Sequence, residues 1–100
     1  MTLSLSSAQK LFLRAQAHNL NPVVTIGDAG LTEAVMKEIE RSIASHELIK
    51  IKSHSRDKAT RDSQITEICE TLNAASVQHI GKILIVYKPG EKAKLVLPKA

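Results

Sequence analysis

Apolar residues recur at helical spacing in three parts of the chain, and each part predicts an amphipathic helix. Ser6 and Gln9 form a capping box, so the first helix is predicted to begin there and to run to about His18. The second helix is predicted from Leu31 to Ser45, and the third around Ile65–Leu72. The residues expected to face the core are Ala8, Leu11, Phe12 and Ala15 in the first helix, Leu31, Val35, Ile39 and Ile43 in the second, and Ile65, Ile68, Cys69 and Leu72 in the third.

Short apolar runs between and after these segments predict strands. Pro22 separates the first helix from the first run, because proline lacks the N–H group that a helix interior needs. In Leu48–Lys52 the hydrophobic residues alternate with Lys50 and Lys52, which is typical of a half-buried strand with its lysines outward. Gly81 and Lys82 are predicted to form the turn between the last two long strands. The predicted strands are 23–26, 48–52, 77–80 and 83–87, and a further short strand is expected at 94–97.

The resulting order of elements, α-β-α-β-α-β-β, predicts an α/β fold in which helices and a small mixed sheet form a two-layer sandwich. Strands joined through a helix favour parallel neighbours, whereas the last two strands form an antiparallel pair. A chain of 100 residues is long enough for one compact domain with a modest core. We therefore expect a single domain over residues 1–100.

The most informative local motif is Gly27-Asp28-Ala29-Gly30, between the first predicted strand and the second helix. A strand that enters such a turn ahead of a helix can present free backbone N–H groups to a phosphate. Glycine also tolerates positive φ and has no side chain to keep a sugar-phosphate backbone away. Two glycines at this spacing form ordinary turns as well, so both interpretations are open at this point.

The charge of the chain is basic overall and unevenly distributed. Fourteen Lys and Arg residues stand against 10 Asp and Glu residues, which gives a formal net charge of +4. Residues 48–61 and 82–99 each have an excess of four positive charges, whereas residues 28–47 have an excess of three negative charges. A chain polarised in this way can attract a polyanion, although lysine-rich faces also occur simply as solvated surface.

Cysteine content and hydropathy indicate the cellular compartment in which the protein is expected. Cys69 is the single cysteine, so no disulfide can form within the chain, and a reducing environment is expected. No secretory signal opens the chain, and the longest apolar run, Ile83–Tyr87, is far too short to span a bilayer. We expect a cytoplasmic monomer without a membrane segment.

Residue types that form catalytic sites do not cluster in the sequence. The histidines and Cys69 show no zinc-ligand spacing, so no metal, cofactor or catalytic residue is expected, and a Cys–His nucleophile is the alternative left open. A dinucleotide-binding site is disfavoured, because Thr25 stands where the first glycine of the G-x-G-x-x-G motif would be. The KH fold is disfavoured, because its G-x-x-G motif joins two helices, whereas here a strand precedes the motif.

Aromatic residues are too few for recognition of nucleic acid by stacking. Phe12 and Tyr87 are the only ones, and Phe12 is expected in the core. Modules that read single strands stack bases on several aromatic side chains. The sequence therefore favours readout of RNA backbone and shape, with one base stacked on Tyr87 as the alternative.

Three further motifs follow the G-x-x-G turn in order, namely His46–Lys52, Ile80-Gly81-Lys82 and Leu84–Pro89. Together with Gly27-x-x-Gly30-Leu31 they resemble the CRM domain (chloroplast RNA splicing and ribosome maturation), in the stand-alone bacterial form of the YhbY family. The resemblance runs from about residue 3 to residue 97. It implies a four-stranded mixed sheet with helices, similar to the C-terminal domain of translation initiation factor three. It also implies a non-catalytic RNA-binding protein linked to precursors of the large ribosomal subunit.

The resemblance places the RNA-binding G-x-x-G loop on residues 27–30. Lysines around such a loop neutralise phosphates without reading base sequence. Structured ribosomal RNA is thus the expected partner. The predicted RNA-binding residues are Gly27, Asp28, Ala29, Gly30, Lys37, Lys50, Lys52, Lys82 and Lys88.

Asp28 departs from the family pattern, since such loops often carry a basic residue between the glycines. A carboxylate repels a phosphate, so we expect Asp28 to turn away and cap the second helix. The alternative is that this loop contributes less to binding than the loops of relatives do. Two functions remain at this point: an RNA-binding protein of large-subunit assembly, and a basic module that binds an acidic protein partner.

Overall fold

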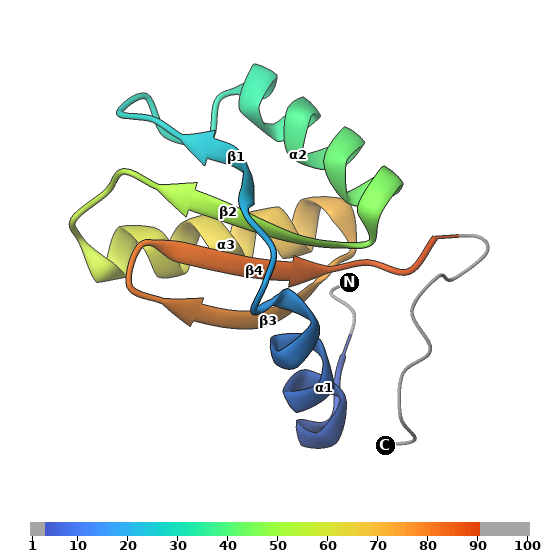
Figure 1. Ribbon diagram of the computed structural model, residues 1–100. Coiled ribbons are helices and arrows are strands. Elements are labelled where there is room, and N and C mark those ends of the chain that lie inside the picture. Colours follow the sequence, from blue (N-terminus) through green and yellow to red (C-terminus); the bar gives the residue numbers. More distant parts are fainter. Residues whose placement is uncertain (1–3, 91–100) are drawn as a thin grey trace.

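The computed structural model describes residues 4–90 (Figure 1). In this part of the chain the elements are α1 (Ser7–Ala17), β1 (Pro22–Ile26), α2 (Glu33–His46), β2 (Leu48–Ser53), α3 (Lys58–Leu72), β3 (Ala75–Ile80) and β4 (Ile83–Tyr87). Their order is the one predicted from the sequence, and the α/β fold class is confirmed. The terminal strand predicted at 94–97 lies outside the described residues.

The four strands form one mixed sheet in the order β1-β2-β4-β3. β1 runs parallel to β2, and β4 pairs antiparallel with both β2 and β3. The register places Thr25 beside Lys52, and Lys52 beside Ile83. The carboxyl ends of β1 and β2 therefore lie at the same end of the sheet as the β3–β4 turn.

The core lies mainly between the sheet and the pair α2 and α3, which form the two layers expected from the sequence. Ile39 and Ile43 of α2 are buried there, as the predicted helical stripe requires. The same holds for all four apolar residues predicted on α3. α1 covers part of the opposite face of the sheet, where Leu13 and Ala17 pack in a second cluster with Leu48, Val77, Ile85 and Tyr87.

The buried face of α1 differs from the predicted one. The helix begins at the expected capping box, in which Ser6 Oγ accepts from the N–H of Gln9 at 3.2 Å. Its fully buried residues are Leu13 and Ala17, however, while Leu11 is 67% exposed. Phe12 of the predicted stripe packs partly buried against the same cluster. The prediction was wrong for Ala8, Leu11 and Ala15, which are exposed, because α1 packs mainly through Leu13 and Ala17, one turn apart.

Within residues 4–90 no helix combines the length and the apolar character needed to cross a membrane. The same residues contain no group of three or more His, Cys, Asp or Glu side chains that could hold a metal ion.

Candidate nucleic-acid interface

Three connections meet at one end of the sheet, on the left in Figure 1: the Gly27–Gly30 turn, the β2–α3 loop of residues 54–57, and the β3–β4 turn. Two backbone hydrogen bonds join them. The N–H of His54 donates to the carbonyl of Ile26 at 2.9 Å, and the N–H of Ser53 donates to the carbonyl of Lys82 at 2.8 Å. We call this group of three connections the loop end.

The G-x-x-G turn closes on itself and leaves two amides free. The N–H of Gly30 donates to the carbonyl of Gly27 at 3.0 Å, and Gly30 has a φ of 77°, which favours glycine at this position. Asp28 and Ala29 are exposed at the tip of the turn, and their N–H groups donate to no acceptor among residues 4–90. These two amides are available to an anionic ligand.

The expectation that Asp28 caps the second helix was wrong. α2 begins at Glu33, and its N-cap is Thr32, whose hydroxyl accepts from the N–H of Val35 at 3.2 Å. Thr32 also donates its own N–H to the carbonyl of Gly30 at 2.9 Å. Asp28 thus lies four residues before the cap, too far along the chain to serve the helix, and its carboxylate has no partner within the described residues.

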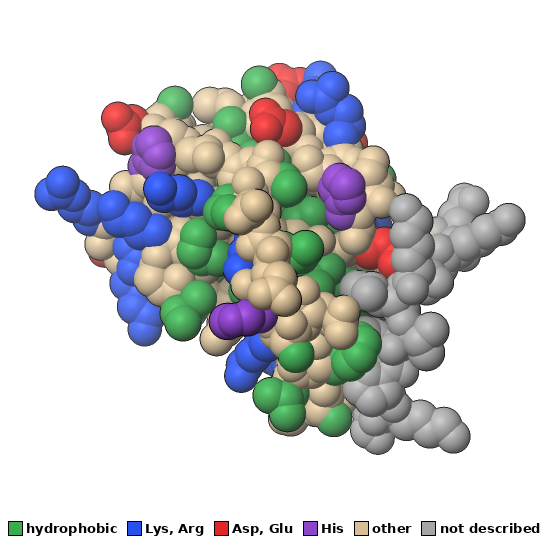
Figure 2. Space-filling model, in the orientation of Figure 1, with side chains coloured by type: hydrophobic (Ala, Val, Ile, Leu, Met, Phe, Trp, Pro, Cys, Tyr) green, Lys and Arg blue, Asp and Glu red, His purple; other side chains and the backbone are tan. Residues whose placement is uncertain are grey.

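Basic residues lie at the same end of the sheet as the turn. Lys52 and Lys82, both predicted to bind RNA, are exposed at the loop end. Arg56 and Lys58 are exposed there as well, on the β2–α3 loop and at the start of α3. They belong to the basic segment 48–61 but were not among the predicted site residues. Figure 2 shows Lys and Arg side chains gathered on the left of the molecule, over this end.

Two acidic residues at the loop end have hydrogen-bond partners within the fold. Oδ2 of Asp57, the N-cap of α3, accepts from the hydroxyl of Thr60 at 2.7 Å and from its N–H at 3.2 Å. The hydroxyl bond is the main cause that lowers the pKa of Asp57. Oδ1 of Asp62 lies 2.6 Å from Nδ1 of His79. Asp28 is therefore the acid that most directly opposes an anion there.

Three of the lysines predicted to bind RNA either lie away from the loop end or already bond to another group of the protein. Lys50 is half-buried, and its Nζ donates to the carbonyl of His18 at the end of α1 over 3.4 Å. Lys37 lies on α2 and pairs with Glu33 at 3.5 Å. Lys88 follows β4 at its far end, about 20 Å from Lys82 for a strand of this length. The fold therefore does not bring Lys88 to the G-x-x-G turn.

A small cavity of about 220 Å³ separates the G-x-x-G turn from α3, and Ser55, Thr60 and Gln64 line its other side. None of these three residues was predicted from the sequence. A signal was present for Gln64, because it stands one turn before Ile68 on the apolar face of the third helix. Ser53, its hydrogen-bond partner, likewise occupies an inward position of β2.

The aromatic residues are unavailable for stacking. The Tyr87 side chain is 1% exposed, and burial, together with the charge of Glu47, raises its pKa. Phe12 packs partly buried against the cluster under α1. Burial likewise raises the pKa of the Cys69 thiol to about 11, which is unlike a reactive nucleophile.

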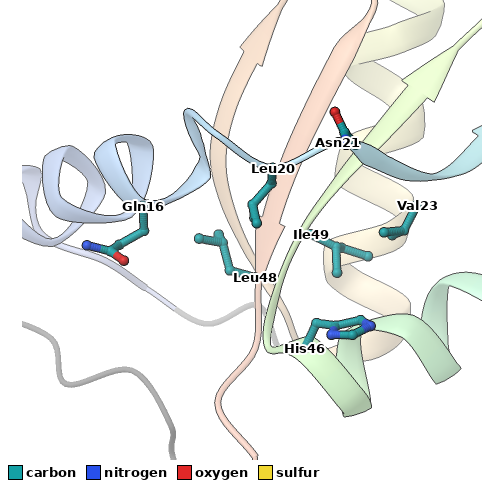
Figure 3. Close-up of a pocket in the computed structure, with 7 residues that line it drawn as sticks. All are labelled: Gln16, Leu20, Asn21, Val23, His46, Leu48 and Ile49. Atoms are coloured by element: carbon teal, nitrogen blue, oxygen red, sulfur yellow. The ribbon is translucent and has the colours of Figure 1, made fainter.

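A second hollow lies outside the loop end, between α1, the start of β1 and the end of α2 (Figure 3). Its volume is about 360 Å³, and most of its lining is apolar, with Leu20 and Val23 partly exposed. His46 is its one titratable lining residue. It offers no cluster of charged groups and is not part of the candidate interface.

Comparisons with known proteins identify relatives that are named as RNA-binding proteins. An RNA-binding protein from Haemophilus influenzae is 49% identical over 96 residues, which cover 96% of this chain and 97% of that protein. A probable RNA-binding protein from Pseudomonas aeruginosa is 36% identical over 90 residues, 90% of this chain and 86% of that one. These relatives are named as RNA-binding proteins and not as enzymes.

A solved structure is also similar. The solution structure of a hypothetical protein from Staphylococcus aureus, described as a candidate RNA-binding protein, matches with a TM-score of 0.84 at 29% identity. The match covers 95% of this chain and 100% of that one. The family model of the CRS1/YhbY (CRM) domain matches residues 5–88. This protein therefore belongs to the CRS1/YhbY (CRM) domain family.

Proposed function

We propose that this protein binds structured RNA, without catalysis, by docking sugar-phosphate backbone on the loop end. The observation that carries the proposal is the pair of free amides at Asp28 and Ala29 beside exposed basic side chains. Backbone N–H groups and basic side chains are the usual partners of phosphate oxygens. The exposed basic residues at the loop end are Lys52, Arg56, Lys58 and Lys82.

Recognition at this end is directed at backbone and shape. The chain has two aromatic residues, and both take part in the core, so neither offers a stacking surface. Phosphate contacts by lysine and arginine give affinity that depends on salt and little on base sequence. Such a surface suits folded RNA whose phosphates are held in a fixed arrangement.

The biological target that we propose is ribosomal RNA in precursors of the large ribosomal subunit, in the cytoplasm. The support is family membership, since relatives are named as RNA-binding proteins. The resemblance to the stand-alone bacterial form of the family implies the link to that subunit. The carboxylate–imidazole pair of Asp62 and His79 near the loop end is held within the fold by contacts of His79 with Arg61 and the carbonyl of Gly81. The proposed role is binding and not chemistry.

Crosslinking in cells tests the proposal. Ultraviolet crosslinking of the tagged protein, with the crosslinked nucleotides mapped, is expected to recover large-subunit ribosomal RNA. Replacing Lys52 and Lys82 by alanine together should remove most of these crosslinks, whereas Lys88→Ala at the far end of β4 is the matched control and should keep them. Recovery of an acidic protein that survives ribonuclease treatment, without RNA crosslinks, would show a protein-interaction module instead.

A further inference from the structure

The cavity beside the G-x-x-G turn is small, and its lining combines polar and apolar surface. One wall is formed by residues 27–30, and the other by Ser55, Thr60 and Gln64. Its volume of about 220 Å³ is below the roughly 300–1,000 Å³ of clefts that enclose whole small ligands. It can therefore take one chemical group of a larger molecule, such as a polymer that continues past its mouth.

Gln64 is the lining residue whose hydrogen bonding is incomplete. It is only 8% exposed, and its Oε1 accepts from Oγ of Ser53 at 2.7 Å. Its Nε2 carries two N–H donors, and neither has an acceptor among residues 4–90. No buried side-chain nitrogen or oxygen of the described residues lacks a partner, so Nε2 of Gln64 reaches solvent through the cavity, where a water or a ligand can accept from it.

Ser53 determines which end of the Gln64 amide is left for the cavity. The Ser53 side chain is fully buried, and its hydroxyl oxygen accepts from the N–H of Ser55 at 3.3 Å. The hydroxyl proton then needs an acceptor, and Oε1 of Gln64 is the one within reach. Turning the amide over would leave this buried proton unpaired, so Nε2 is the free end.

Free donors therefore stand on both sides of the cavity, with the amides of Asp28 and Ala29 on one wall and Nε2 of Gln64 on the other. These donors fit a group rich in oxygen acceptors, although the Asp28 carboxylate, which also belongs to the lining, opposes a negative charge. We propose that the cavity receives one sugar-phosphate unit of the bound RNA, and that Gln64 donates from Nε2 to one of its oxygens. The proposal rests on the proposed function and adds a specific binding residue to it. The accepting oxygen belongs either to the phosphate or to the ribose 2′-hydroxyl, which DNA lacks.

A pair of variants isolates the Gln64 donor. Ser53→Ala combined with Gln64→Met removes both partners of the buried hydrogen bond, and replacing both by apolar groups is nearly neutral for stability. Ser53→Ala alone is the matched control, because it breaks the same bond and keeps the amide. Affinity is measured by fluorescence anisotropy with a labelled RNA hairpin that carries a single-stranded tail, and with DNA of the same sequence.

The double variant is expected to bind the RNA hairpin roughly two- to tenfold more weakly than Ser53→Ala, the loss of one hydrogen bond. A loss confined to RNA identifies the 2′-hydroxyl as the acceptor, and an equal loss for DNA identifies the phosphate. Equal affinities of the double variant and the control for both probes would overturn the role of Gln64. Failure of the wild-type protein to bind either probe would instead overturn the proposed function, and this assignment with it.

Nuclear magnetic resonance on the wild-type protein gives a test that does not depend on a variant folding. The side-chain NH₂ signals of Gln64 are expected to shift strongly when the RNA hairpin is added to saturation. If the Gln64 side-chain signals stay in place while the backbone amide signals of Asp28 and Ala29 move, RNA binds the turn without entering the cavity.

Discussion

The Nε group of Arg61 donates to Nε2 of His79 over 3.1 Å, and this contact joins α3 to β3 at the loop end. Nη1 of Arg61 also donates to the carbonyl of Ser55 at 2.9 Å. Nε2 of His79 also lies 3.1 Å from the carbonyl of Gly81, and its Nδ1 lies 2.6 Å from Oδ1 of Asp62. In the tautomer with its proton on Nδ1, His79 accepts from Arg61 and donates to Asp62. One arginine side chain thus holds the β2–α3 loop, which carries Arg56, against the sheet.

Arg61→Ala should lower the free energy of unfolding by about 1–3 kcal/mol, because it removes hydrogen bonds from a charged donor to half-buried acceptors. Arg56→Ala is the control, since that arginine is exposed on the same loop and its loss should stay within about 0.5 kcal/mol. Urea denaturation of both variants measures the difference. A loss for Arg61→Ala no larger than that for Arg56→Ala would show that the contact with His79 contributes nothing.

The two glycines of the turn should respond differently to alanine. Gly30 has a φ of 77°, a conformation that costs an alanine about 1–2 kcal/mol. Gly27 has no positive φ, and a Cβ there would meet no atom within 4 Å, so Gly27→Ala should keep or slightly raise stability. Thermal denaturation compares the two variants. An equal fall in melting temperature for both would contradict the turn geometry.

Lys52 and Lys88 should separate the loop end from the far end of β4 in a salt titration. Lys52→Ala is expected to lower the slope of log affinity against log salt by about one, as the loss of one phosphate contact does. Lys88→Ala should leave the slope unchanged. The Lys50→Ala variant is expected to act mainly on stability, because its Nζ already bonds to the carbonyl of His18. An effect of Lys88→Ala equal to that of Lys52→Ala would place the RNA elsewhere.

Asp28→Lys should strengthen RNA binding by about 1 kcal/mol or less, the scale of an exposed charge contact, without lowering the melting temperature. The helix keeps its cap, because Thr32 and not Asp28 supplies it. Thr32→Ala gives the complementary result, a loss of about 1 kcal/mol of stability with RNA affinity unchanged. Weaker binding by a folded Asp28→Lys protein would show that the carboxylate organises the turn.

Alkaline pH should destabilise the protein through Cys69. Burial raises the pKa of its thiol from 9.0 to about 11, so the folded state favours the protonated form. The contribution to stability is complete below about pH 9 and is lost as the pH rises toward 11. The unfolding free energy of the wild-type protein should therefore fall relative to that of Cys69→Ala over this interval. Parallel pH profiles of the two proteins would contradict the burial of the thiol.

Local sequence patterns determined which segments form helices and strands. The capping box at Ser6 and Gln9, the alternation along Leu48–Lys52 and the apolar stripe of α3 each depend on residues within a few positions of one another. Hydrogen bonds and side-chain periodicity at this range are set by the chain itself. The G-x-x-G turn was visible for the same reason, since both of its glycines and its closing hydrogen bond lie within four residues.

Tertiary structure decided what meets at the loop end, because parallel and antiparallel pairing joins residues that are far apart in the sequence. Lys82 and Lys88 look equivalent in the sequence, yet β4 places them at opposite ends of the sheet. The buried face of α1 depends on where the helix crosses the sheet, which the helical period alone does not encode. Gln64 becomes a candidate RNA-binding residue only because β2 places Ser53 within hydrogen-bond distance of it and the turn after β1 lines a cavity beside it. These relationships arise from burial of the whole sheet, so no local pattern could specify them.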